Sequence, residues 1–174
     1  MKALRMVLAL AMAVAAAGAA VAQTTPDPAV QEAREETAVV FDLGRVFGFI
    51  RTMEEENASL RLSAEQVREL YVIMTEIRRT ERMDPDQADE WLASIEDEIL
   101  TPAQLVAVDK LYLARETTRG SGTGAGSGAG GGTGDATGSI ATYIAGGKFN
   151  PILDTSKSMG ADFAAFYDEL GERR

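Results

Sequence analysis

The sequence predicts an all-α protein: a small bundle of about four short helices, a glycine-rich linker, and a short C-terminal amphipathic helix. Three observations lead to this fold class. Apolar residues between positions 38 and 118 recur at helical spacing. Three segments in that region carry the side-chain pattern that starts helices. The same region contains no convincing strand pattern, so a bundle of helices is the expected architecture.

Residues 1–22 have the three zones of a secretory signal peptide. Lys2 and Arg5 precede an apolar, alanine-rich run, which ends in the small residues at positions 20–22. We expect cleavage after Ala22, and therefore a periplasmic or secreted mature protein. A stable membrane anchor is not expected, because a span needs about 20 strongly apolar residues.

The composition excludes most familiar enzyme sites. The chain has 27 acidic and 17 basic residues, a formal net charge of −10, and neither cysteine nor histidine. An acidic surface repels nucleic acid and anionic lipid. Without histidine or cysteine there is no disulfide, no usual proton shuttle at neutral pH and no common zinc ligand. We therefore expect a protein that is not an enzyme, with no cofactor, no metal and no nucleic-acid partner.

The first helix is predicted over about residues 39–57. The preceding segment, 23–37, is polar and contains two prolines, so we expect a flexible N-terminus there. Gly44 and Gly48 lie four residues apart in the helix and would let another helix approach closely inside the bundle. The apolar face of this helix comprises Val39, Leu43, Val46, Phe47, Ile50 and Met53.

Three further helices are predicted to begin with the same capping box. In this pattern an N-cap side-chain oxygen accepts from the backbone at N3, and a glutamine at N3 reaches back to the N-cap amide. Apolar stripes follow each start, so these segments complete the bundle over residues 38–118. The three pairs are Ser63 with Gln66, Asp84 with Gln87, and Thr101 with Gln104.

The C-terminal part divides into a linker and a tail. Residues 119–138 are mostly glycine, serine, threonine and alanine, a composition that predicts a disordered linker. The tail, residues 139–174, contains a predicted helix ended by Gly171. Its apolar stripe is too short to be stable alone, so it must dock either on the bundle in cis or in the groove of a partner protein. The stripe consists of Phe163, Phe166, Tyr167 and Leu170.

Two carboxylate motifs resemble metal sites. Asp154, Ser156 and Ser158 match the DxSxS metal-ion motif of von Willebrand factor A domains, but too few residues follow for that doubly wound domain. We interpret the segment as a turn and helix cap formed by the same oxygens. The acidic residues that follow Asp84 lack calcium-loop spacing, and acids in the first turn of a helix complement its dipole.

A family resemblance rests on two short motifs. Residues 100–104 read LTPAQ, an LTxxQ motif, and residues 62–66 read LSAEQ, the same motif with serine in place of threonine. Together with the signal peptide and the helical body, they resemble the Spy/CpxP-like LTxxQ family of periplasmic proteins over about residues 60–115. The resemblance implies a helical envelope-stress protein with ATP-independent chaperone activity.

These expectations combine into a non-enzymatic helical protein that binds other proteins. Its partners would be a protein partner or unfolded clients, with a homo-oligomer left open, and it would act as an envelope-stress chaperone or regulator. The alternative is a structural or accessory envelope component that assembles through its glycine-linked C-terminal helix. The candidate protein-binding side chains are Trp91, Tyr112, Phe163, Phe166, Tyr167 and Leu170.

Overall fold

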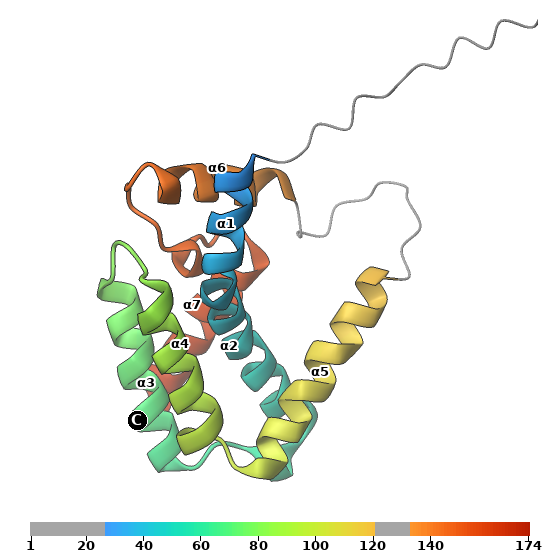
Figure 1. Ribbon diagram of the computed structural model, residues 1–174. Coiled ribbons are helices and arrows are strands. Elements are labelled where there is room, and N and C mark those ends of the chain that lie inside the picture. Colours follow the sequence, from blue (N-terminus) through green and yellow to red (C-terminus); the bar gives the residue numbers. More distant parts are fainter. Residues whose placement is uncertain (1–26, 121–132) are drawn as a thin grey trace, which may run out of the picture.

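The all-α fold class is confirmed. The computed structural model describes residues 27–120 and 133–174 (Figure 1), and within them it contains helices and no strand. The predicted signal peptide and its cleavage site, and the central part of the predicted linker, lie outside the described residues. The helices are more numerous than predicted, seven α-helices in the described part of the chain, because two more lie in segments expected to be non-helical.

The α-helices are α1 (Pro28–Glu36), α2 (Ala38–Glu56), α3 (Ala64–Arg79), α4 (Pro85–Ala93), α5 (Pro102–Gly120), α6 (Thr133–Ile144) and α7 (Ser158–Arg173). Short 3₁₀ turns precede α3 and α7, namely η1 (Ala58–Leu60) and η3 (Pro151–Leu153). A π-helical turn, η2 (Ser94–Ile99), extends α4.

Helices α1 and α6 are the two unexpected elements. Residues 28–36, expected to be flexible, form α1, because Asp27 accepts a hydrogen bond from the Ala29 amide and Pro28 stands at the first helical position. Helix α6 begins inside the segment expected to be a disordered linker. The two helices pack against each other at one end of the molecule (Figure 1), which offsets their weak individual propensities.

Helix α2 is the central element of the bundle. Helices α4, α5 and α7 all contact it. Figure 1 shows α3 and α4 as antiparallel neighbours, while α5 diverges from α2 with increasing distance from its N-terminus. The molecule is therefore a packed body of helices from which α5 extends as an arm.

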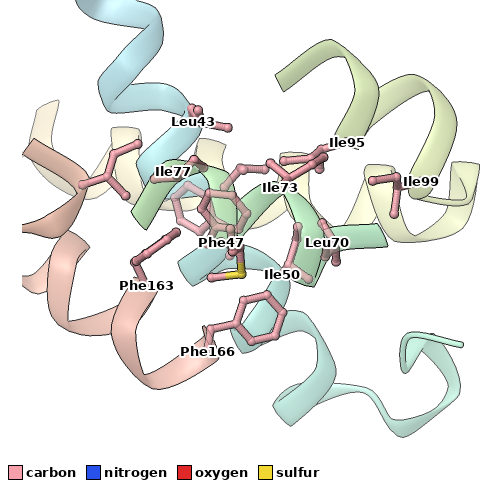
Figure 2. Close-up of a cluster of buried hydrophobic side chains, with 14 of the residues drawn as sticks. Leu43, Phe47, Ile50, Leu70, Ile73, Ile77, Ile95, Ile99, Phe163 and Phe166 are labelled. Carbon is pink, nitrogen blue, oxygen red and sulfur yellow. The ribbon is translucent and has the colours of Figure 1, made fainter. Parts of the chain in front are cut away.

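The core joins α2 to helices on both sides of it. Figure 2 shows large apolar side chains from α2, α3, η2 and α7 directed toward one another. The ring of Phe47 meets that of Phe163 edge to face, with centroids 5.2 Å apart. Such pairs add about 0.5–1.5 kcal/mol beyond their burial. Fully buried members of this core include Leu43, Phe47, Ile50, Leu70, Ile77, Ile95, Phe163 and Phe166.

The C-terminal helix docks in cis. Helix α7 packs on α2 and α3, and its apolar stripe lies in the core. The close approach uses Gly44, since a Cβ there would overlap the side chain of Met159. Gly160 makes a second close approach, because a Cβ at that position would overlap the backbone of Asp154. These glycines let α7 lie against α2 and against the turn that precedes it.

The predicted end of this helix at Gly171 is wrong, because α7 continues to Arg173. The Arg173 guanidinium donates to both carboxylate oxygens of Glu54, each at 2.9 Å. Glu54 is buried and also accepts from the Leu62 amide at 2.8 Å. This bidentate pairing raises the pKa of Arg173. One carboxylate on α2 thus connects the end of α7 with the segment that leads into α3.

Replacing Phe163 with alanine should destabilise the protein by about 3–5 kcal/mol, because the side chain is 1% exposed and its removal leaves a cavity in the core. Chemical denaturation followed by circular dichroism measures the change. Val72→Ala is the matched control: Val72 is 60% exposed on α3, so its substitution should change stability by no more than about 0.5 kcal/mol. Equal effects of the two substitutions would contradict cis docking of α7.

Candidate protein-binding surface

Two of the capping glutamines meet in the joint between α3 and α5. Gln66 donates from Nε2 to the Oε1 of Gln104 at 2.7 Å, and the reverse bond from Gln104 to Gln66 measures 3.4 Å. Each Oε1 also accepts from the amide of its own N-cap residue, Ser63 at 2.9 Å or Thr101 at 2.8 Å. The starts of the two helices are therefore locked to each other through side chains that cap them.

The same glutamines hold the segments that enter the two helices. Gln66 donates to the Ile99 carbonyl at 2.6 Å, and Gln104 donates to the Leu60 carbonyl at 3.0 Å. Both glutamines are buried; Gln104 is only 3% exposed. Buried amides with all their partners specify one arrangement, because any other leaves polar groups unpaired. The joint thus fixes the angle at which α5 leaves the body.

The third predicted capping box forms only in part. Asp84 caps α4, but it accepts from the Asp86 amide at 2.9 Å and not from Gln87. Gln87 does not reach back; its amide donates to Glu90 on the exposed surface at 3.1 Å. The difference arises because Asp84 caps α4 and Pro85 needs no hydrogen-bond partner for its nitrogen, so the helix can begin without a second side chain. Within the described part of the chain, the side-chain amide of Gln87 also makes no contact like the one between Gln66 and Gln104.

Helix α5 packs against the body through a narrow stripe. Val108 is buried, and Leu105 and Leu111 are partly buried against the core. Two other apolar side chains have no such cover, since Val106 is 51% and Leu113 61% exposed. The helix therefore presents exposed apolar side chains outside its packed stripe.

Two hollows flank α5. The larger, of about 680 Å³, lies where α5 passes the end of α2 and η1. We call it the Met53 hollow; it is open and mainly apolar, with Lys110 and Glu56 as its charged residues. Its full lining is Met53, Glu56, Asn57, Leu60, Ala103, Val106, Ala107, Lys110 and Leu111.

The second hollow, of about 240 Å³, lies between α2, η2 with the end of α4, and α5. We call it the Phe49 hollow. The ring of Tyr112 meets that of Phe49 edge to face, with centroids 5.9 Å apart. Its lining is Asp42, Val46, Phe49, Leu92, Glu96, Val108, Asp109 and Tyr112. Three carboxylates therefore surround an aromatic and aliphatic wall.

Glu96 is the perturbed group of this hollow. Partial burial, followed by the negative charges of Asp109, Asp97, Asp42 and Asp89, raises its pKa. It lies in the π turn η2, a helical irregularity that is frequent at functional sites. Asp42 is paired with Arg45 at 2.6 Å. A cation placed near Glu96 would therefore relieve repulsion that the folded chain retains.

The sequence-predicted binding residues separate into two groups. Tyr112 lines the Phe49 hollow and is 36% exposed. Trp91 is partly buried against the core and lines neither hollow. The C-terminal stripe is covered by α2 and α3: Phe163, Phe166 and Leu170 are buried in the core, and Tyr167 is partly buried against it.

Several residues of this surface were missed by the sequence reasoning. Phe49 and Glu96 were not among the predicted binding residues. Phe49 lies in a helix whose apolar residues are typical of a bundle core, and Glu96 lies in a run of acidic residues typical of an exposed helix face. Only the angle of α5 brings them together with Tyr112. One signal in the sequence was Phe49 itself. It is a large apolar residue that lies beside Ile50 but outside the predicted apolar face of its helix, so it could contact a further element.

The structure shows what the two carboxylate motifs do locally. Asp154 accepts from the amide of Ser156 at 3.0 Å and from its hydroxyl at 2.6 Å, and these bonds lower the pKa of Asp154. The turn interpretation is confirmed, but the helix cap is not: Lys157 is the N-cap of α7, and its side chain does not cap the helix. Within residues 27–120 and 133–174, no group of three or more carboxylates is arranged to hold a metal ion.

Comparison of the chain with known protein families, curated proteins and solved structures finds no match. Among the helices in the described ranges, none is both long and apolar enough to span a bilayer.

Substitution of either joint glutamine by alanine should cost about 1–3 kcal/mol, since each leaves buried polar partners unsatisfied. The double variant Gln66→Ala with Gln104→Ala should cost less than the two single losses together, by about 0.5–3 kcal/mol, because both remove the same bond. Urea unfolding of the four proteins measures this coupling. Gln87→Ala is the control and should be nearly neutral, and strict additivity would contradict the joint.

Glu96→Gln should alter how stability depends on pH. Free glutamate titrates near pH 4.3, and the folded protein holds its Glu96 proton to higher pH. As pH rises through that window, the unfolded chain releases this proton first, so the wild-type protein loses stability relative to the variant. Thermal melting of both proteins across the acidic range tests this. A difference that does not change with pH would refute it.

Proposed function

We propose that this is a secreted or periplasmic, non-enzymatic helical protein that binds apolar segments of other proteins, as an envelope-stress chaperone or regulator. The observation that carries the proposal is the surface of α5. This helix packs on one side only, has exposed Val106 and Leu113, and is flanked by two hollows. Exposed apolar surface beside polar residues is typical of protein-interaction sites. The LTxxQ resemblance supports the same class of function.

The Phe49 hollow suggests the chemistry of the bound segment. Apolar side chains would pack on Phe49 and Tyr112, while a lysine or arginine would lie near Glu96 and Asp109. Long basic side chains suit such a place, because their stems are apolar and their ends are charged. We therefore propose that the preferred segments combine apolar and basic residues. Charge complementarity of this kind raises association rates and rejects acidic segments.

The openness of both hollows supports transient binding. They lie on the surface beside α5, so a segment could enter without any helix leaving the core. The acidic exterior, with a formal net charge of −10, would keep the protein and its complexes apart in solution. Both properties suit a protein that holds aggregation-prone segments and then releases them.

The alternative, assembly through the C-terminal helix, has a weaker basis. Helix α7 would have to leave the core and expose Phe163, Phe166 and Leu170, which are buried in cis. Exposing each such side chain costs about 1.5–3 kcal/mol. The surface of α5 needs no such release, so it is the better candidate for contact with other proteins.

The double substitution Val106→Ser with Leu113→Ser should weaken suppression of client aggregation severalfold, because it removes exposed apolar area from α5 without adding charge. Light scattering of a reduced, unfolding client at equimolar protein measures the effect. Val72→Ser, at an equally exposed position on α3, is the matched control and should retain full activity. No suppression by the wild-type protein, together with concentration-dependent self-association, would favour the structural alternative.

Charge preference is tested with three fluorescent peptides that share one apolar sequence: an uncharged parent, one carrying added lysines and one carrying added glutamates. The lysine peptide should bind more tightly, and added salt should reduce its advantage. Glu96→Gln should reduce the preference and leave binding of the uncharged parent peptide unchanged. Equal binding of both charged peptides would refute the proposed role of the carboxylates.

A further inference from the structure

Tyr71 on α3 and Tyr167 on α7 form a stacked pair at the edge of the interface between these helices. Their ring centroids lie 4.7 Å apart, and the ring planes differ by 20°. The Tyr167 hydroxyl donates to the Tyr71 hydroxyl at 2.8 Å. Both side chains are only partly buried against the core. The pair is thus held in contact by stacking and a hydrogen bond, and it is still partly exposed to solvent.

Basic side chains cover the two rings. The guanidinium of Arg78 lies 4.2 Å from the ring centroid of Tyr167, and that of Arg174 lies 4.4 Å from the centroid of Tyr71. The hydroxyl of Thr75 lies 3.3 Å from the Tyr167 hydroxyl. Hydrogen bonding with Thr75 and with Tyr71 lowers the pKa of Tyr167, whereas hydrogen bonding with Tyr167 raises the pKa of Tyr71. One phenol of the pair therefore gives up its proton more easily than the other.

We propose that Tyr71 and Tyr167 are a modification site, at which a one-electron oxidant such as a haem peroxidase with hydrogen peroxide forms an intramolecular dityrosine cross-link. Each phenol loses one electron and one proton, and the two radicals couple through a new bond between ring carbons ortho to the hydroxyls. The hydrogens on those carbons then move to the oxygens and restore both phenols. The two electrons and two protons reduce one peroxide molecule to two water molecules.

The observed geometry shares one feature with the product, the adjacency of the two hydroxyls. In dityrosine the hydroxyls lie beside the new bond and face each other, as the two hydroxyls of this pair do in their 2.8 Å contact. The stacked rings turn toward a biaryl arrangement as the carbon–carbon bond forms, and the hydroxyl contact keeps their hydroxyl-bearing edges adjacent. Holding two reacting groups in this way replaces a bimolecular encounter by a local step.

The other two tyrosines lack such a partner. Tyr112 packs on Phe49, and Tyr143 packs on Phe149 with ring centroids 4.9 Å apart. The sequence contains four tyrosines in all. The structure therefore assigns intramolecular coupling to one pair, although oxidant can reach more than one ring.

The cross-link would act on the C-terminal helix. It joins residues 96 positions apart and so closes a long loop between α3 and α7. Closing such a loop restricts the unfolded chain and favours the folded one. The chain has no cysteine, so no disulfide can supply this connection. Oxidation would thus fix α7 on the bundle covalently.

The test treats the full chain with haem peroxidase and limiting hydrogen peroxide, then follows dityrosine fluorescence and maps the link by peptide mass spectrometry. We expect a monomer that is lighter by two hydrogen atoms, a link between Tyr71 and Tyr167, and a higher melting temperature. The double variant Tyr112→Phe with Tyr143→Phe should retain the full yield, and Tyr71→Phe should lose the intramolecular link. Denaturant present during oxidation should lower the yield of this link severalfold.

Three outcomes would overturn the inference. Links that involve Tyr112 or Tyr143 as often as Tyr71 would show that the pair has no preference. Cross-links only between molecules, or an intramolecular yield unchanged in denaturant, would show that folded geometry does not direct coupling. Phenylalanine is used at position 71 because its ring can still stack on Tyr167. Circular dichroism of the Tyr71→Phe protein checks that the variant is folded, so that loss of the link can be assigned to loss of the phenol.

Discussion

The reciprocal contact between Gln66 and Gln104 determines how the molecule is arranged. Each side chain closes its own helix start, bonds to the other, and holds the carbonyl of the segment that enters the opposite helix. The two side-chain amides satisfy four backbone groups and each other at one point, so the joint has one favourable geometry. The direction of α5, and with it the two hollows along that helix, follows from this joint.

Helix α7 is also held in place by a small number of polar contacts. Its aromatic stripe fills the core beside α2, and a single buried carboxylate, that of Glu54, receives both its terminal guanidinium and the Leu62 amide. The helix is thereby held at its middle by apolar packing and at its end by charge. Exposed apolar side chains remain along α5, where Val106 and Leu113 have no apolar cover.

Local sequence signals predicted the individual helices better than the way in which the helices pack together. The periodic stripe of α2 predicted both its bounds within one residue, and the caps at Ser63 and Thr101 predicted where α3 and α5 begin. Helix α1 was missed because its composition is polar and its stability comes from contact with α6, which is distant in sequence. The Phe49 hollow could not be predicted for the same reason: its lining comes from α2, from α4 and its π turn, and from α5, and only their packing assembles it.

Gly160 illustrates how strongly one tertiary contact restricts the sequence. Its hydrogen in place of a side chain lets the first turn of α7 rest directly on the peptide of Asp154. Alanine, the smallest alternative, would already place a Cβ in overlap with that backbone, so the preceding turn would have to shift. Among diverged relatives of this chain, selection should therefore retain glycine at this position after most exposed positions have changed. In a sequence alignment, this invariant glycine would help to recognise remote relatives.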